Sequence, residues 1–188
     1  MISDPQCSTL PHRLNGTNLY LIGMMGSGKT TTGQELAAAL GYRFMDTDRL
    51  IEQVAGQSVS EIFAQAGEAT FRQLETQVLA EVSCYHHLVV ATGGGIILEP
   101  MNWSYLHHGL VIWLKVSIPN LVNRLAGDTT RPLLAHAALA EKLTTLAQAR
   151  NEFYAQADLT LTIADDLRPH QVSQAILTAL PKILRDDI

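Results

Sequence analysis

The hydrophobic positions of the chain fall into two kinds of segment that alternate along its length. Short runs rich in aliphatic and β-branched residues are separated by longer segments in which apolar residues recur every three or four positions. Because most of the short runs carry apolar residues toward both sides, they are typical of strands covered by helices on both faces. We therefore predict an α/β fold with βαβ units and a mainly parallel sheet. The predicted strands lie in "NLYLIG", "YRFMD", "HLVVAT", "GLVIWL" and "DLTLTI".

The longer segments predict helices, and the ends of one of them carry clear signals. Ser117 and Pro119 are typical of a helix start, and Gly127 is typical of a helix end. The segment 127–136, "GDTTRPLLAH", is polar and then turn-prone, so we predict a mobile loop of the kind that closes over a site as a lid. The predicted helices span residues 29–40, 59–66, 69–83, 119–126, 137–156 and 170–180.

The N-terminal segment, residues 1–17, lacks the apolar core of a signal peptide and is poor in arginine. We expect it to be a flexible extension. Residues 18–188 are enough for one ordinary domain, and a hydrophobic content of 47% supplies its core. No apolar run approaches the roughly 20 residues of a membrane span, so we expect a cytoplasmic protein with no membrane contact.

The net charge and the two cysteines limit the kinds of ligand and covalent cross-link that the protein can have. A net charge of -5, with only 13 lysines and arginines, argues against a broad basic surface for nucleic acid. Any anionic ligand must therefore be held by a few local groups. The two cysteines, Cys7 and Cys84, match no zinc or disulfide spacing and indicate free thiols, and we expect Cys84 to be a small buried residue.

The segment "GMMGSGKT" fits the pattern G-x-x-x-x-G-K-[ST] between a predicted strand and a predicted helix. Glycines allow the backbone N–H groups to turn toward phosphate oxygens, and the helix N-terminus adds a positive dipole. Lys29 would reach the β- and γ-phosphates of a nucleotide, and the Thr30 hydroxyl would ligate Mg²⁺. The sequence therefore predicts a phosphate-binding loop with contacts from Gly26, Ser27, Gly28, Lys29, Thr30 and Thr31.

Two carboxylates follow the second predicted strand, in "MDTD". The third strand, in "VVATGGG", ends without the acidic residue that other P-loop proteins place there. Asp46 and Asp48 would lie at the carboxyl edge of the sheet, where open α/β sheets bind ligands. One of them can hold a magnesium-bound water and the other can face an acceptor hydroxyl. Helix capping is the alternative role for this pair.

Two arginines and a glycine run suggest an acceptor site at the same edge. Arg150 stands in an apolar helix stripe, and a cation that points inward needs an anionic partner because an unpaired buried charge is very costly. Arg72 lies within one helical turn of Glu68 and Glu75, an arrangement that also fits a surface salt bridge. The run "TGGG", residues 92–95, lets the backbone approach a ligand closely.

Taken together, these motifs resemble the shikimate kinase family over about residues 18–180. The segments that carry the resemblance are "GMMGSGKTT", "MDTD", "IFAQAGEATFRQLE", "VVATGGG", "RPLL" and "ARNEFY", in that order. The resemblance implies a five-stranded parallel sheet of order 2-3-1-4-5 with a lid. It also implies phosphorylation of the 3-hydroxyl of shikimate by ATP with Mg²⁺. We expect a monomer that binds this small molecule.

The resemblance also implies roles for individual residues. Lys29, Asp48 and Arg131 would be catalytic, with Arg131 on the lid, and Arg124 would lie against adenine. Thr30 and Asp46 would hold the metal ion. Acceptor contacts would fall on Asp48, Arg72, Gly93, Gly94, Gly95 and Arg150.

Some positions depart from the family pattern. Glu152 replaces a proline that many members carry, and "ADDLRPH" is only loosely similar, which leaves a role for Arg168 open. By the resemblance, Glu75 would hold the two substrate arginines.

Two other functions are alternatives to a shikimate kinase. One is another small-molecule kinase, such as a gluconate-type or nucleoside monophosphate kinase, and the other is a non-catalytic binding protein. The intact motifs argue against the last of these.

Overall fold

The protein is built on a five-stranded parallel sheet in the order β2-β3-β1-β4-β5, which is the order that the family resemblance implies. The computed structural model describes residues 5–126, 136–164 and 167–184. Strand β1 lies in the centre, and its Leu19 pairs with Val89 on one side and with Leu110 on the other. The strands are β1 Leu19–Ile22, β2 Arg43–Asp46, β3 Leu88–Ala91, β4 Leu110–Val116 and β5 Leu159–Ile163.

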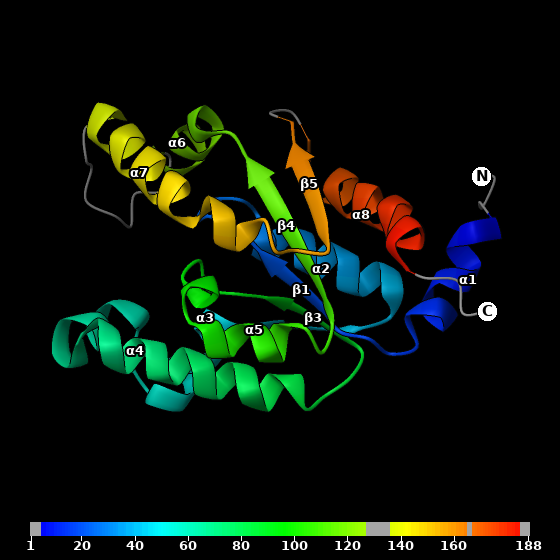
Figure 1. Ribbon diagram of the computed structural model, residues 1–188, viewed down its shortest axis with the longest axis horizontal. Helices are drawn as coiled ribbons and strands as arrows, with labels where there is room; N and C mark the ends of the chain where they lie inside the picture. The colour runs from blue at the N-terminus through cyan, green and yellow to red at the C-terminus, as the bar shows by residue number, and fades with distance from the viewer. Residues whose placement is uncertain (1–4, 127–135, 165–166, 185–188) are drawn as a thin grey trace.

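Helices cover both faces of the sheet (Figure 1), with α2 and α8 on one side and α4 and α5 on the other. The side chains of β1 alternate between two hydrophobic cores. Leu19 and Leu21 belong to the core that includes residues of α2 and α8, and Tyr20 and Ile22 belong to the core that includes residues of α4 and α5. The helices are α1 Pro5–Leu14, α2 Lys29–Leu40, α3 Thr47–Ala55, α4 Val59–Ser83, α5 Pro100–Leu106, α6 Ile118–Ala126, α7 His136–Tyr154 and α8 Pro169–Ile183, with a 3₁₀ turn at Ile96–Leu98.

The predicted break between residues 66 and 69 is present inside α4. Gly67 has φ 80° and ψ 171°, so it joins two helical segments that the sequence predicted separately. The first segment begins with a capping box, in which Ser58 Oγ accepts from the Glu61 amide and Glu61 Oε2 accepts from the Ser58 amide. Helices α3 and α5 were not predicted, because they are short and their apolar patterns span few turns.

The N-terminal segment differs from the flexible extension that the sequence led us to expect. Residues Pro5–Leu14 form α1, in which Leu10 and Leu14 are only 1% and 0% exposed. The spacing of four residues places both leucines on one helix face, which packs into the core beside α8. Arg13 Nη2 donates to the Leu184 carbonyl at 3.1 Å, past the end of α8. This part of the prediction was therefore wrong.

Two further expectations concern Cys84 and membranes. Cys84 is an exposed free thiol that follows α4, so the expectation that it is buried was wrong. Its position just past the helix leaves it outside both core clusters. Within residues 5–126, 136–164 and 167–184, no helix is both long and apolar enough to cross a membrane.

Candidate active site

The glycine-rich loop connects the central strand β1 to helix α2. Gly28 has φ 88° and immediately precedes α2, with no side chain capping the first turn. Gly26, with φ 77°, likewise adopts a left-handed conformation that favours glycine. Because the first amides of a helix have no partner within it, this helix end is suited to an anion.

Lys29 crosses the glycine-rich loop and holds its shape. Its Nζ donates to the carbonyls of Gly23 at 2.9 Å and Met24 at 3.0 Å. Burial of the ammonium group lowers the pKa of Lys29 to about 8, although the charges of Asp48 and Asp46 oppose this shift. A positive group is thus held at the loop with a pKa close to neutral pH.

Asp46 caps helix α3 and also contacts the phosphate-binding loop. Its Oδ1 accepts from the backbone amides of Asp48 at 3.1 Å and Arg49 at 3.4 Å, so it caps α3. Its Oδ2 accepts from the Thr30 hydroxyl at 2.8 Å. This arrangement brings a hydroxyl and a carboxylate oxygen together beside the phosphate-binding loop. Oxygen atoms of this kind are the ligands that Mg²⁺ prefers.

The segment "TGGG" after β3, residues 92–95, is fixed to neighbouring elements by hydrogen bonds of its first two residues. Thr92 Oγ1 donates to the Leu21 carbonyl at 3.0 Å, and the Gly93 amide donates to the buried Thr47 hydroxyl at 2.9 Å. A Cβ atom at Gly93 would lie 2.5 Å from Glu75 Oε1 and 2.7 Å from Asp48 Oδ1. Both carboxylates therefore reach the backbone at this point, and only glycine leaves room for them.

The next two glycines contact the two arginines. Arg150 Nη1 donates to the Gly94 carbonyl at 3.1 Å, and a Cβ atom at Gly95 would overlap the Arg72 guanidinium. Gly94 also lies against the phosphate-binding loop, because a Cβ there would be 3.6 Å from the Gly23 carbonyl oxygen. The structure thus brings Asp48, both arginines and the phosphate-binding loop to one short stretch of backbone.

Arg72 is held by two glutamates on its own helix. Its Nη1 donates to Glu75 Oε2 at 2.6 Å, and its Nη2 donates to Glu68 Oε1 at 2.8 Å. Burial alone would lower the pKa of Arg72, but the bonds and charges of Glu75 and Glu68 raise it. Burial raises the pKa of Glu75, whose side chain is 0% exposed, despite the opposing effect of Arg72. The surface salt-bridge alternative is therefore insufficient, since one partner is fully buried.

A cavity of about 390 Å³ opens on the other side of the phosphate-binding loop. Arg124 lies in it, with Nη1 3.3 Å from the Gly26 carbonyl oxygen that accepts its hydrogen bond. Arg168, whose role the sequence left open, also lines this cavity, so the loosely matching segment does reach the site. The remaining lining residues are Ser27, Gly28, Thr31, Thr32, Ile163, Leu167, Pro169 and Val172.

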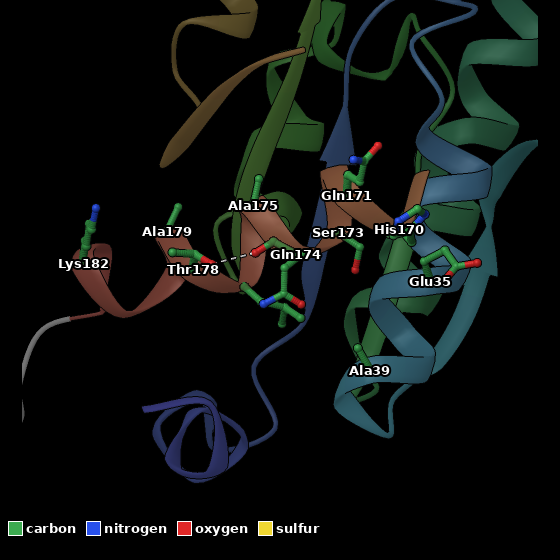
Figure 2. A pocket seen from close by; sticks show the side chains of 11 residues that line it. Glu35, Ala39, His170, Gln171, Ser173, Gln174, Ala175, Thr178, Ala179 and Lys182 are labelled. Carbon is green, nitrogen blue, oxygen red and sulfur yellow. Dashed lines mark hydrogen bonds between the residues drawn. The ribbon is translucent and has the colours of Figure 1, made fainter. Parts of the chain in front are cut away.

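A larger hollow of about 660 Å³ lies between α2 and α8 (Figure 2), where Glu35, His170 and Lys182 are among its lining residues. None of the residues predicted to bind nucleotide, metal ion or acceptor lines it. The larger hollow is therefore separate from the predicted site.

Some predicted and unpredicted residues complete the description of the site. Arg131 and residues 127–135 of the predicted lid 127–136 lie outside the described residues, and His136 begins α7. The sequence reasoning missed Thr47 and Tyr154, which bond to Gly93 and to Gly94. The position of Tyr154 four residues after Arg150 on the same helix was a signal that could have suggested it.

A glycine-rich loop leading from the central strand of a parallel sheet into a helix defines the class of P-loop proteins, and the charged groups beside this loop suit a small-molecule kinase. The family model described as shikimate kinase matches residues 25–181. This chain belongs to the shikimate kinase family. It is therefore a kinase that uses ATP and Mg²⁺.

Individual relatives agree with this assignment. A shikimate kinase of Thermosynechococcus vestitus is 57% identical over 94% of this chain and 96% of its own length. One of Synechococcus elongatus is 56% identical, over 92% of this chain and 91% of its own. The solved structure of Acinetobacter baumannii shikimate kinase in complex with shikimate has a TM-score of 0.83 and 34% identity, covering 95% of this chain and 98% of that one. These likenesses favour shikimate kinase over the gluconate-type alternative.

The described residues fit Mg²⁺ bound together with nucleotide phosphates. Thr30 and Asp46 supply adjacent oxygen atoms, and the open amides of α2 suit the phosphates. In the parts of the chain that the structure describes, no cluster of three or more histidine, cysteine or acidic side chains could hold a metal ion. Mg²⁺ is commonly held by one or two protein groups plus substrate phosphates, which agrees with such a small set of ligands.

Proposed function

We propose that this chain transfers the γ-phosphoryl group of ATP to the 3-hydroxyl of shikimate. The observation that carries this proposal is the arrangement around residues 93–95. There, Asp48, Arg72 and Arg150 meet three consecutive glycines beside the phosphate-binding loop. A carboxylated, hydroxylated acceptor needs both cations for its carboxylate and a hydrogen-bond acceptor for its hydroxyl, and these groups supply both.

On the nucleotide side, the amides at the start of α2 and the Lys29 ammonium would hold the phosphates. Thr30 and Asp46 would hold Mg²⁺ through the hydroxyl oxygen and a carboxylate oxygen. When bound, the ion would neutralise charge on the phosphate oxygens. The cavity beside the phosphate-binding loop would take the base between Arg124 and Arg168. Most of the rate gain would come from alignment and from preorganised charge.

On the acceptor side, Arg72 and Arg150 would hold the carboxylate by charge-assisted hydrogen bonds. Asp48 would orient the hydroxyl and accept its proton as the acceptor oxygen bonds to the γ-phosphorus. The bond from that phosphorus to the bridging oxygen breaks, and ADP leaves. Buried Glu75 would keep Arg72 in place rather than take part in the reaction. By the family resemblance, Arg131 would add positive charge at the transferring group.

An assay of ADP release separates the candidate functions. The purified chain would be given Mg·ATP with shikimate, gluconate or a nucleoside monophosphate. We expect turnover with shikimate alone. Turnover with gluconate instead would support the gluconate-type alternative, and shikimate binding without turnover would support a non-catalytic role.

We expect Arg150→Ala to raise the KM for shikimate, or lower kcat/KM, by at least about 30-fold. Loss of one partner of a desolvated charge pair costs roughly 2 to 5 kcal/mol. ATP affinity should change little. Steady-state kinetics with shikimate and its amide analogue test this, because wild type should strongly prefer the acid and the variant should prefer it much less. Arg43→Ala, at the start of β2, is the matched control.

Arg72→Ala should give a similar loss, and the losses of the two variants should not add because both side chains meet one anion. Removing Arg72 also leaves buried Glu75 without its cation, so the double variant Arg72→Ala with Glu75→Gln separates binding from folding. Equal rates of wild type with acid and amide would contradict the assignment of the arginines.

We expect nucleotide binding to take up a proton near pH 8. The pKa of Lys29 is about 8 in the free protein, and neighbouring phosphates favour its charged form, so binding raises this pKa. As pH rises above 8, a growing share of free protein must first be protonated, and affinity should fall toward about tenfold per pH unit.

Titration calorimetry with Mg·ADP at pH 8, in buffers of different ionisation enthalpy, measures the uptake of protons. We expect about half a proton per nucleotide, from a group half protonated at its pKa. The uptake should vanish in Lys29→Met. Uptake that persists in this variant would assign the proton to another group.

A monomeric, cytoplasmic enzyme is the simplest form of this proposal. The groups proposed to bind ATP and shikimate lie together on a single chain. The exposed thiol of Cys84 suits a reducing compartment. Sedimentation of the purified protein with and without shikimate tests its oligomeric state.

A further inference from the structure

Tyr154, the last residue of α7, is a buried polar residue without a role in the reaction as described so far. It is 1% exposed, and its hydroxyl donates to the Gly94 carbonyl at 3.0 Å. The same carbonyl accepts from Arg150 Nη1 at 3.1 Å. Two side chains of one helix, four residues apart, therefore share a single backbone oxygen in the middle of the glycine run.

The glycine run depends on these bonds at its centre. Its two ends are held by backbone bonds, from Ile96 to the Gly93 carbonyl at 3.3 Å and from Leu98 to the Gly95 carbonyl at 3.0 Å. Because Gly94 has no side chain that could pack, the hydrogen bonds from Arg150 and Tyr154 of α7 hold the glycine run through the Gly94 carbonyl. The phosphate-binding loop has its own bonds through Lys29 and does not need this contact.

The aromatic ring of Tyr154 is fixed independently of its hydroxyl. It stacks on Trp113 of β4 with the ring centres 5.4 Å apart and the planes 16° apart. Lys115 Nζ lies 4.9 Å from the centre of the Trp113 ring. A ring held in this way directs its hydroxyl at one point, which limits where Gly94 and the neighbouring Arg150 can settle.

We propose that Tyr154 is a positioning residue for the acceptor, which fixes the Gly94 carbonyl and, through it, the Arg150 guanidinium that binds the acceptor carboxylate. This inference rests on the proposed function. Without the Tyr154 hydroxyl, Arg150 would be the one described side chain that still donates to the Gly94 carbonyl. The Arg150 guanidinium would then be less well aligned to bind the acceptor carboxylate. The phosphate-binding loop should be unaffected.

The ionisation of Tyr154 agrees with a permanent donor. Burial raises the pKa of Tyr154 to about 12, although the charge of Arg150 opposes the shift. The hydroxyl therefore keeps its proton throughout the pH range of an ordinary assay. Its effect on the acceptor should be the same from neutral to moderately alkaline pH.

Tyr154→Phe tests this proposal, because it removes the hydroxyl and keeps the ring. We expect the KM for shikimate to rise about 3- to 10-fold, the range of one net hydrogen bond. The kcat and the KM for ATP should stay within about twofold of wild type. The preference for shikimate over its amide should fall, because Arg150 is less well aligned. Tyr20→Phe, which changes another fully buried tyrosine in β1, is the control and should leave the KM for shikimate unchanged.

A direct binding measurement keeps the proposal testable if Tyr154→Phe folds poorly. Trp103 and Trp113 are the two tryptophans of the chain, so Trp103→Phe leaves Trp113 as the sole indole fluorophore. Shikimate should change its emission in this variant, because Trp113 stacks on Tyr154 and Tyr154 bonds to the acceptor site. No change in emission at saturating shikimate would overturn the proposal.

The outcomes separate this proposal from the proposed function. If wild type fails to phosphorylate shikimate, the proposed function fails. If wild type turns over and Tyr154→Phe keeps the same KM and the same preference for the acid, Tyr154 is structural and this proposal fails. An equal rise in the KM values for ATP and for shikimate would also overturn it, since it would show that Tyr154 supports the phosphate-binding loop as well.

Discussion

Asp48→Asn is expected to lower turnover by roughly 10²- to 10⁴-fold while nucleotide affinity stays near that of wild type. The side chain lies in the first turn of α3 and reaches the backbone of Gly93 beside buried Glu75. Asparagine has nearly the same shape but cannot accept the hydroxyl proton. Single-turnover kinetics with Mg·ATP and shikimate, together with calorimetry of Mg·ADP binding, measure the two effects separately.

The structure removes one competing explanation for a loss at Asp48. The cap of α3 is Asp46, so Asp48→Asn leaves that cap intact and the melting temperature should change little. Asp158→Asn is a matched control, because the Asp158 carboxylate accepts from the Val111 amide at the opposite edge of the sheet. Normal turnover in Asp48→Asn with a lower melting temperature would show that Asp48 is structural.

Lys29→Met is expected to lower turnover by at least about 100-fold, because one preorganised charge at the transition state is worth several kcal/mol. The methionine side chain is of similar length and lacks the ammonium group. It also loses the bonds to the Gly23 and Met24 carbonyls, so the loop geometry should be checked through ADP binding. Turnover measured at saturating ATP separates the chemical effect from weaker binding.

Lys182→Met provides the control for this experiment and tests the larger hollow at the same time. Lys182 is exposed on α8 and lines the hollow between α2 and α8 (Figure 2). We expect this variant to keep wild-type kinetics. If Lys182→Met lost activity while Lys29→Met kept it, the nucleotide site would have to be moved to the hollow.

The sequence predicts the parts of the fold that depend on local signals. All five strands were found, because each is a short segment with β-branched, aliphatic or aromatic residues between segments of helical pattern. The break at Gly67 was predicted because two helical patterns flank it. The phosphate-binding loop was found because its glycines, Lys29 and Thr30 are contiguous. In each case the information lies within a few residues of the structure it determines.

The error at the N-terminus and the residues that were missed concern contacts between distant residues. Burial of α1 depends on α8, and the bond from Arg13 to Leu184 spans 171 positions. The bond from Tyr154 to Gly94 spans 60 positions, and the only signal for it in the sequence is the place of Tyr154 four residues after Arg150. Asp46 was recognised, but its simultaneous bonds to Thr30 and to α3 required the sheet edge to be assembled. Such partners are determined by packing rather than by local pattern.

The central place of β1 has a consequence for how the protein is made. Strand β1 is the first of the five to leave the ribosome, yet its neighbours β3 and β4 begin only at Leu88 and Leu110. A nascent chain that stops short of β4 would leave one edge of β1 unpaired, and open edges are prone to aggregate. Strand β1, which precedes the phosphate-binding loop, can therefore complete its pairing only after β4 has been synthesised. Nucleotide binding by a growing chain should begin only after β4 has emerged.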